Sequence, residues 1–245
     1  MKNYTAPNHL LNDKVILITG ASGGIGKTIA TTYANYGATV ILHGRNIERL
    51  EGIYDEIVNA GHAKPAIIPL DLSKATTEDY QQLATMVQDE FGKLDGIVHN
   101  AAAISELTPI EFTETSSWFE LMQVNVNAVF MLTQSCLSLL KNSKNASIIT
   151  TSSGVGRKGR AFWGAYAVSK FAIEGFTQVL ADELENTNVR VNAINPGGTK
   201  TKMRATAFPA EDKTKLPEPK KLMPIYLYLM GDDSIEVNGQ SVNAQ

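Results

Sequence analysis

The stretch "KVILITGASGGIGKTIA", residues 14–30, joins an apolar run to an amphipathic one through a turn rich in glycine. Gly20 would make the sharp turn, Gly24 would let a phosphate approach the backbone, and Gly26 would allow close helix–strand packing. The helix that starts here offers free backbone N–H groups and the positive end of its dipole, which favour an anion such as a pyrophosphate. The stretch predicts a dinucleotide-binding turn, and a tight strand–helix connection without a ligand is the alternative.

Apolar and amphipathic segments alternate along the rest of the chain. The apolar runs are unbroken, as expected of strands that are covered on both faces of a sheet. We predict strands at 14–19, 38–43, 66–70, 96–100, 147–151, 189–194 and 240–243. We predict helices near 24–36, 46–60, 76–91, 115–141, 164–186 and 219–230. This order favours a parallel, doubly wound α/β sheet with right-handed crossovers.

Composition and charge narrow the class of protein. The chain has 245 residues, 43% of them hydrophobic, which is enough for one α/β domain spanning residues 1–245. A net charge of −3 gives no basis for a nucleic-acid partner. Cys136 is the only cysteine, so an intrachain disulfide is impossible, and we expect it to fill space in the core. No signal-like region and no run long enough to span a membrane is present, so we expect a cytoplasmic protein.

The end of the second predicted strand bears on which dinucleotide binds. Its sequence, "ILHGRN", lacks the carboxylate that would accept from a ribose 2′-hydroxyl, and Arg45 stands just beyond it. A guanidinium suits a 2′-phosphate through its charge and its forked hydrogen bonds, so we predict NADP(H) in preference to NAD(H). The alternative is a solvated Arg45. We expect His43 to be a strand-end residue rather than a ligand.

Two polar residues end the next two strands. Asp71 follows the third strand and could accept a hydrogen bond from the adenine amino group, or it could cap the next segment. Asn100 ends the fourth strand, at the edge where doubly wound sheets place groups that contact ligands. Both residues are therefore candidate cofactor contacts.

A second motif lies in "TSSGVGRKGRAFWGAYAVSK", residues 151–170. Tyr166 and Lys170 are four positions apart and share one helix face. A nearby ammonium favours the phenolate, so we expect Lys170 to lower the tyrosine pKa from about 10 and to make Tyr166 a general acid–base group. Lys170 could also bond a cofactor ribose, and Ser153 could hold a carbonyl oxygen near the phenol. Taken alone, a Tyr-x-x-x-Lys spacing is mostly a chance surface pattern.

Two further segments carry expectations. Asn125 lies in the apolar run "WFELMQVNVNAVFMLTQ", where a buried amide needs partners, and a water chain to Lys170 would satisfy it. Solvent exposure is the alternative, and we expect it for Asn127. The run is apolar on more than one face, which favours contact with a second subunit. Residues 202–221, rich in proline and charge, form either a substrate-binding lid or a disordered insertion.

Together these motifs resemble the short-chain dehydrogenase/reductase family, in its single-domain branch of about 250 residues. The family's Thr-Gly-x-x-x-Gly-x-Gly turn falls on 19–26, its Asn-Asn-Ala-Gly element on "HNAA" at 99–102, and its Pro-Gly segment on "NPGGTKT" at 195–201. More narrowly, "WGAYAVSKFA" and "LYLMGDD" resemble the YciK group of bacterial oxidoreductases. The chain departs from the family at His99, at Ala102, and at Gly23, where many NADP-preferring members carry a basic residue.

The resemblance implies a Rossmann-type, three-layer sheet of about seven strands with helices on both faces. It implies a catalytic set of Asn125, Ser153, Tyr166 and Lys170. It implies cofactor contacts at Thr19, Gly20, Ser22, Gly24, Ile25, Gly26, Arg45, Asp71, Leu72, Asn100, Ala101, Tyr166, Lys170, Pro196, Gly197, Thr199 and Thr201. We expect no metal and a homodimer or homotetramer.

These expectations combine into one activity with two rivals. We expect an NADP(H)-dependent oxidoreductase that transfers hydride between nicotinamide and a small-molecule carbonyl or alcohol. One rival is a reductase of 3-oxoacyl thioesters on an acyl carrier protein, attracted by the bases at Arg157, Lys158, Arg160, Lys200, Lys202 and Arg204; a solvated basic rim is the simpler interpretation. The other rival is a non-catalytic NADP(H) sensor or scaffold.

Overall fold

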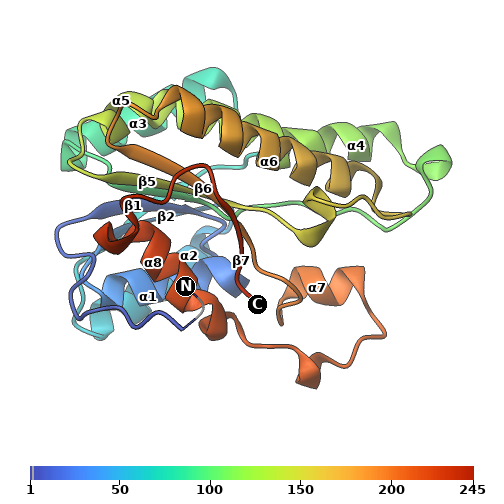
Figure 1. Cartoon of the computed structure of the whole chain (residues 1–245), viewed down its shortest axis with the longest axis horizontal. Helices are drawn as coiled ribbons and strands as arrows, with labels where there is room; N and C mark the ends of the chain where they lie inside the picture. Colours follow the sequence, from blue (N-terminus) through green and yellow to red (C-terminus); the bar gives the residue numbers. More distant parts are fainter. Residues whose placement is uncertain (2) are drawn as a thin grey trace.

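A parallel sheet organises the part of the chain that the computed structural model describes, residues 1 and 3–245 (Figure 1). Within those residues it has seven strands in the order β3-β2-β1-β4-β5-β6-β7, and each neighbouring pair is parallel. The strands are β1 (Val15–Thr19), β2 (Thr39–Gly44), β3 (Ala66–Pro69), β4 (Gly96–His99), β5 (Ala146–Thr151), β6 (Val189–Asn195) and β7 (Ser241–Asn243). The chain runs outward from β1 to β3 and restarts at β4, so the order reverses between β1 and β4. Doubly wound sheets bind ligands outside the carboxyl ends of the strands at such a reversal.

Helices cover both faces of the sheet (Figure 1). They are α1 (Gly24–Asn35), α2 (Ile47–Asn59), α3 (Thr77–Phe91), α4 (Thr115–Met122), α5 (Ala128–Lys141), α6 (Gly164–Glu183), α7 (Lys202–Ala207) and α8 (Met223–Met230). α1, α2 and α8 lie on one face, and α3, α5 and α6 lie on the other. The predicted fold class is confirmed, and every predicted strand boundary falls within one residue of the observed one. No helix among the described residues is long and apolar enough to cross a membrane.

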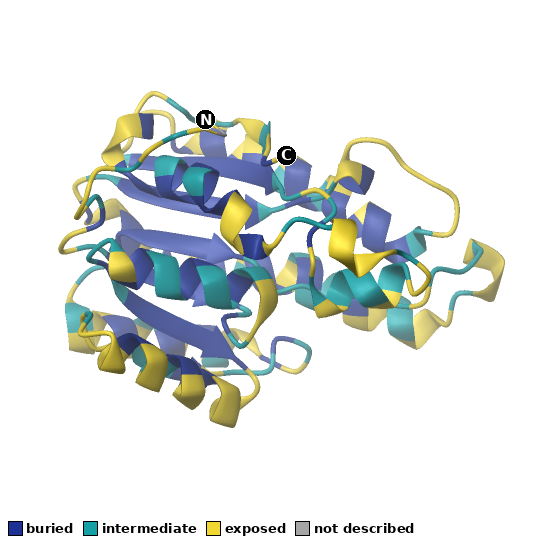
Figure 2. Ribbon diagram, turned by 90° about the horizontal axis from the view of Figure 1, so that it is seen from below, coloured by how far each residue is buried: buried dark blue, intermediate teal, exposed yellow. Residues whose placement is uncertain are grey.

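Burial follows these layers (Figure 2). The central strands are dark blue in that view, and the outer sides of the helices are yellow. Cys136 is buried in the cluster between the sheet and the layer of α3 and α5, as expected for a space-filling residue. Asn127 is exposed and donates to Gln123 at 2.9 Å, which confirms the expected solvent exposure.

Three predicted helices differ in detail from those observed. The run 115–141 is interrupted by a π-helical segment, η2 (Gln123–Asn127), between α4 and α5. The helix predicted to reach residue 186 ends at Glu183. The first turn of the predicted 219–230 helix is a 3₁₀ segment, η5 (Pro219–Leu222), since Pro219 and Pro224 restrict the backbone there.

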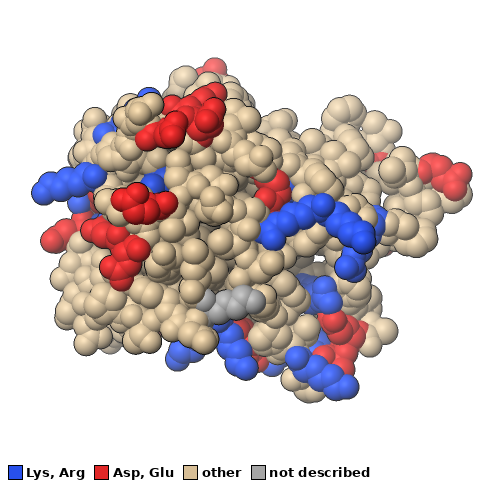
Figure 3. All heavy atoms as spheres, viewed as in Figure 1, with Lys and Arg blue, Asp and Glu red and all other residues tan. Residues whose placement is uncertain are grey.

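Residues 202–221 form short helical segments joined by turns. They hold α7, the 3₁₀ turn η4 (Lys213–Lys215) and most of η5. Acidic and basic side chains intermix at the lower right of Figure 3, where Figure 1 places the chain that follows α7. Lys200 pairs with Glu218 at 2.5 Å, and the Lys200 amide donates to the Pro217 carbonyl at 3.0 Å, so the segment is tied back onto its own start.

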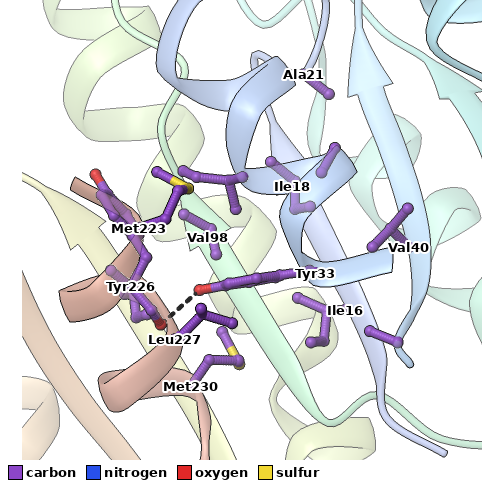
Figure 4. Packing of buried hydrophobic residues seen from close by; sticks show 14 of the residues in the cluster. Ile16, Ile18, Ala21, Tyr33, Val40, Val98, Met223, Tyr226, Leu227 and Met230 are labelled. Atoms are coloured by element: carbon purple, nitrogen blue, oxygen red, sulfur yellow. Dashed lines mark hydrogen bonds between the residues drawn. The ribbon is translucent and has the colours of Figure 1, made fainter. Parts of the chain in front are cut away.

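One apolar cluster fixes α1 and α8 against the sheet (Figure 4). The Tyr33 hydroxyl, fully buried, donates to the Tyr226 carbonyl oxygen at 2.8 Å. That bond satisfies a polar group that would otherwise be costly to bury. It joins the first helix to the last, and so holds α1, whose N-terminus faces the site described next.

Candidate active site

A cavity of about 970 Å³ opens at the carboxyl ends of the strands, where the strand order reverses. Its wall comes from the turn after β1, the ends of β2 and β4, the loop after β5, the start of α6 and the segment 195–208. Ligand pockets run from about 300 to 1,000 Å³, so this cavity is at the large end of that range. It is large enough to hold a dinucleotide together with a second small molecule.

The glycine turn forms the floor of the cavity. Gly20 and Gly24 both have positive φ, 67° and 55°, which L side chains rarely adopt. A Cβ on Gly26 would overlap the Gly20 carbonyl oxygen, so glycine is required for the helix to start this close to the strand. α1 has no side-chain cap and no acidic residue in its first turn. Its free N–H groups therefore remain available to an anion, as the sequence predicts.

Two arginines stand at the end of the cavity beyond β2. Arg45 is exposed and lines the cavity together with Arg49, in the first turn of α2. The Asn46 side chain caps α2 by accepting from the Arg49 amide at 2.8 Å, which fixes where the second arginine emerges. Sequence reasoning missed Arg49, although its position four residues after Arg45 is a detectable signal. Hydrogen bonds from Ser73, helped by the charge of Arg45, hold the Asp71 pKa below its usual value.

Asp71 follows β3 and does not cap the next helix. It lines the cavity, and its Oδ1 accepts from the Ser73 amide at 3.1 Å and from the Ser73 hydroxyl at 2.8 Å. It therefore closes a tight turn after β3 rather than capping α3, whose cap is Thr76. Asn100 also lines the cavity and donates to the Thr19 carbonyl at 3.2 Å.

The two histidines at strand ends are buried and neutral. His43 lines the cavity, and neither of its ring nitrogens has a hydrogen-bond partner. Burial lowers the His43 pKa to about 4. His99 lies behind the wall, where its Nε2 is 2.8 Å from the Thr133 hydroxyl, and burial lowers its pKa to about 3. The departure from the family at His99 therefore changes packing on the α5 side, not the cavity surface.

Tyr166, Lys170 and Ser153 meet on the cavity wall, as the sequence predicts. Tyr166 and Lys170 lie on α6 and are buried, while Ser153 follows β5. The Lys170 ammonium donates to the Thr151 carbonyl at 2.7 Å and lies 5.5 Å from the centroid of the Tyr166 ring. These contacts place a cation, a phenol and a hydroxyl in the same cavity as the glycine turn.

The expected direction of the tyrosine pKa shift is not found. Burial raises the Tyr166 pKa to about 12, and a hydrogen bond with Ser153 only partly opposes this. Burial also lowers the Lys170 pKa to about 8, against the attraction of Glu174 one turn further along α6. Desolvation of the buried phenol is the largest influence on the Tyr166 pKa. The phenol is therefore in its protonated, donating form at neutral pH.

Asn125 is buried behind the cavity wall, in the π-helical segment η2. Its amide donates to the Ala103 carbonyl at 3.0 Å and to the Ser169 hydroxyl at 3.0 Å, and its carbonyl accepts from the Ala103 amide at 2.7 Å. Ser169 in turn donates to the Tyr166 carbonyl at 2.8 Å. Protein groups thus accept from both amide hydrogens of Asn125. Asn125 ties the loop after β4 to the α6 turn that carries Tyr166.

The Pro-Gly segment closes the cavity on its far side. Thr201 caps α7 by accepting from the Arg204 amide at 3.1 Å. The Gln245 side chain, two residues beyond β7, donates to the Gly198 carbonyl at 3.2 Å and to the Thr199 hydroxyl at 3.0 Å and so holds this segment in place. Sequence reasoning missed Gln245, which lies far from the segment along the chain.

Most of the predicted cofactor contacts line the cavity. These are Gly20, Ser22, Gly24, Ile25, Arg45, Asp71, Leu72, Asn100, Ala101, Tyr166, Lys170, Pro196, Gly197, Thr199 and Thr201. Thr19, Gly26 and Asn125 lie behind the wall instead. The Thr19 hydroxyl accepts from the amides of Asn100 and Ala101, each at 3.0 Å, and therefore joins the ends of β1 and β4 rather than facing a ligand.

Three of the six basic residues predicted to form a rim, Arg157, Lys200 and Arg204, pair with protein groups. Arg157 contacts Glu174 at 3.2 Å and Asn243 at 2.8 Å. Arg204 makes a forked pair with Glu211, both contacts at 2.6 Å. Arg160 and Lys202 line the cavity and are exposed, with no ion-pair partner among the described residues. The basic rim is therefore smaller than the sequence suggests.

Comparison with known proteins identifies the class. The short chain dehydrogenase family matches residues 14–212 of this chain. The chain therefore belongs to the short-chain dehydrogenase family, and it is an oxidoreductase. It is 52% identical over 243 residues to the "uncharacterized oxidoreductase YciK" of Escherichia coli K12, covering 99% of this chain and 96% of that one. The predicted resemblance to that group is confirmed.

Two solved structures are similar over nearly the whole chain. A short-chain dehydrogenase of Shigella flexneri 2a in complex with NADP is 52% identical, covers 98% of this chain and 100% of that one, and has a TM-score of 0.95. A short-chain dehydrogenase of Escherichia coli CFT073 in complex with NADPH is 53% identical, with the same coverage and TM-score.

Proposed function

We propose that this protein is an NADP(H)-dependent reductase of carbonyl compounds, with Tyr166 as the proton donor. One observation carries the proposal: the buried phenol of Tyr166, the Ser153 hydroxyl and the Lys170 ammonium share one cavity with the uncapped N-terminus of α1. A site that only senses a dinucleotide has no need of a phenol with a serine and a lysine beside it. That geometry favours an enzyme over the sensor or scaffold.

The residues at both ends of the cavity fit NADP(H). The uncapped start of α1 suits the pyrophosphate, and Arg45 with Arg49 suits a 2′-phosphate through charge and forked hydrogen bonds. β2 ends without a carboxylate, which would repel that phosphate. The complexes of the two similar dehydrogenases with NADP and NADPH support the same cofactor. Bound NADPH supplies the hydride.

The residues of the chain handle the oxygen and its proton. Ser153 donates a hydrogen bond to the carbonyl oxygen and orients it toward Tyr166. Tyr166, protonated at neutral pH, donates its proton to that oxygen as negative charge develops. Lys170 stabilises the phenolate that remains, and Asn125 positions Tyr166 through Ser169. Solvent restores the proton after release of the alcohol.

A homodimer or homotetramer remains part of the proposal. Large apolar side chains are exposed on the two long helices of one face, namely Phe130 on α5 and Val168, Phe171 and Val179 on α6. Apolar side chains at this density favour a protein partner, and a second copy would bury them. Light scattering with size-exclusion chromatography would measure the subunit number.

The central test is oxidation of NADPH with a panel of ketones and aldehydes. We expect Tyr166→Phe to lower turnover by about 10²–10⁴-fold, because the general acid is lost, while NADPH binding remains. Ser153→Ala should cost about 10²–10³-fold, as for one lost donor to the oxygen. Full turnover in Tyr166→Phe would show that another group delivers the proton.

A further inference from the structure

The half of the cavity around Tyr166 is apolar and aromatic. Tyr166 packs in a cluster with Val155, Trp163, Ile104 and Met203, among others. The Trp163 ring lies 5.6 Å from the Tyr166 ring and 5.7 Å from the ring of Phe208, which follows α7. Ile104, Val155, Trp163, Met203 and Phe208 all line the cavity. A substrate oxygen that reaches Tyr166 therefore brings the rest of its molecule against hydrocarbon and ring faces.

One cation beside this wall, Arg204, is already paired with an acidic side chain. The Arg204 guanidinium lies 3.8 Å from the centroid of the Phe208 ring and makes a forked pair with Glu211. The side chains of both charged residues are about three-quarters covered, with exposed fractions of 26% and 29%. A forked, partly covered pair is a strong one, so a substrate anion would have to displace Glu211 to reach Arg204. The pair acts instead to hold Phe208 in the wall.

The other basic residues near the site either pair with protein groups or are exposed to solvent. Arg157 is held by Glu174 and Asn243, and Lys200 is held by Glu218. Arg160 and Lys202 line the cavity but are exposed, and the acidic Glu120 lines it with them. Exposed charges of mixed sign contribute little binding energy because solvent and salt screen them.

We propose that the substrate is an uncharged ketone with an apolar ring next to its carbonyl, not a carboxylate and not a thioester on an acidic carrier. This inference rests on the proposed reductase function. Hydride from NADPH adds to the carbonyl carbon, the carbonyl π bond breaks toward oxygen, and the Tyr166 proton goes to that oxygen. The products are a secondary alcohol and NADP⁺. The ring packs against Trp163 and Phe208, where burial of its apolar surface favours binding.

A matched set of probes with the full-length protein and NADPH tests the substrate class. The set is 1-tetralone, 4-methylcyclohexanone, 4-oxocyclohexanecarboxylate, acetoacetyl-coenzyme A and the small reactive diketone 2,3-butanedione. We expect kcat/KM to be at least about 10²-fold higher for 4-methylcyclohexanone than for its carboxylate analogue, since the anion loses hydration and the unpaired cations, Arg160 and Lys202, are exposed and screened by solvent. We expect 1-tetralone to be better still, because its second ring adds apolar contact.

The outcomes separate the substrate inference from the reductase function. Reduction of butanedione without reduction of the ring ketones, or a preference for the oxo acid or the thioester, overturns the substrate inference and leaves the function standing. Oxidation of NADPH with none of the probes overturns both. Quenching of tryptophan fluorescence by 1-tetralone in the presence of NADP⁺ gives a second readout, and an absence of quenching contradicts binding beside Trp163.

Two variants test the residues that carry the inference. Phe208→Ala should raise KM for 1-tetralone by about tenfold, while Phe208→Leu keeps the wall apolar and should retain most of the affinity. Glu211→Gln frees the Arg204 guanidinium, so kcat/KM for 4-oxocyclohexanecarboxylate should rise and the discrimination between the matched pair should narrow. Unchanged discrimination in Glu211→Gln would show that the pair does not set charge selectivity.

Discussion

The Lys170 ammonium lies over the ring of Tyr166, 5.5 Å from its centroid. It is anchored there by the Thr151 carbonyl at 2.7 Å. In this position its charge does not offset the cost of burying a phenolate, so the tyrosine pKa rises to about 12. Tyr166 is therefore suited to donate a proton, and the Lys170 ammonium stabilises the phenolate that forms after the donation.

The first prediction concerns the pH dependence of reduction. Burial lowers the Lys170 pKa to about 8, so the ammonium that stabilises the phenolate is present below that pH and is lost as pH rises through it. We expect kcat for ketone reduction to fall above about pH 8. Glu174 raises the lysine pKa, so Glu174→Gln should move this alkaline limb to lower pH. Steady-state kinetics across pH with NADPH measure both effects.

Glu174→Gln keeps the shape of the side chain and can still bond Ser152, whose hydroxyl contacts Glu174 at 2.5 Å. A thermal melt would verify that the variant is folded. If kcat falls at the same alkaline pH in wild type and in Glu174→Gln, Glu174 has no electrostatic effect on Lys170.

The second prediction concerns cofactor choice. Arg45→Ala and Arg49→Ala should each weaken NADPH binding by about 10–100-fold, since each removes a charged hydrogen bond worth about 1.5–3 kcal/mol. NADH lacks the 2′-phosphate, so its affinity should change little. Thermal shifts with increasing NADPH and NADH give the two dissociation constants. Equal losses for both nucleotides would mean that the arginines contact another part of the cofactor.

The third prediction concerns the glycine turn. A Cβ on Gly26 would overlap the Gly20 carbonyl oxygen and lie 2.6 Å from Asn100 Nδ2, so Gly26→Ala should lower the unfolding free energy by about 1–3 kcal/mol. Gly23→Ala is the matched control, because a Cβ there meets no atom within 4 Å and its φ of 171° suits any residue. Denaturant melts of both variants measure the difference. Equal stability would show that α1 can shift away from β1.

The sequence predicted the elements that depend on local pattern. Unbroken apolar strands and the glycine turn follow from residues adjacent in the chain, and so does the Tyr166–Lys170 spacing. The missed features depend on distant partners. Gln245, which follows the neighbouring strand β7, bonds Thr199, which follows β6, and the Arg204 guanidinium pairs with Glu211 on the far side of a turn. The tyrosine pKa was predicted in the wrong direction because spacing reports a neighbouring charge and not the burial that outweighs it.

The last prediction concerns stability in acid. His43 and His99 are buried with pKa values lowered to about 4 and about 3, whereas an unfolded histidine has a pKa of about 6.5. Below about pH 6.5 these histidines become protonated in the unfolded chain but stay neutral in the folded one. The unfolding free energy should therefore fall by about 1.4 kcal/mol per pH unit for each histidine, until the pH reaches its folded pKa. Above about pH 6.5 neither histidine makes the unfolding free energy depend on pH.

His43 is the better residue for the test, since its ring nitrogens make no hydrogen bond that a substitution would break. Denaturant unfolding at pH 7 and pH 5 should show a smaller pH effect in His43→Leu than in wild type, by about 1–2 kcal/mol. The exposed His9 has a positive φ of 64°, which asparagine tolerates, so His9→Asn is the control and should keep the wild-type dependence. If His43→Leu and His9→Asn lose the same stability between the two pH values, the buried ring is not the group that senses acid.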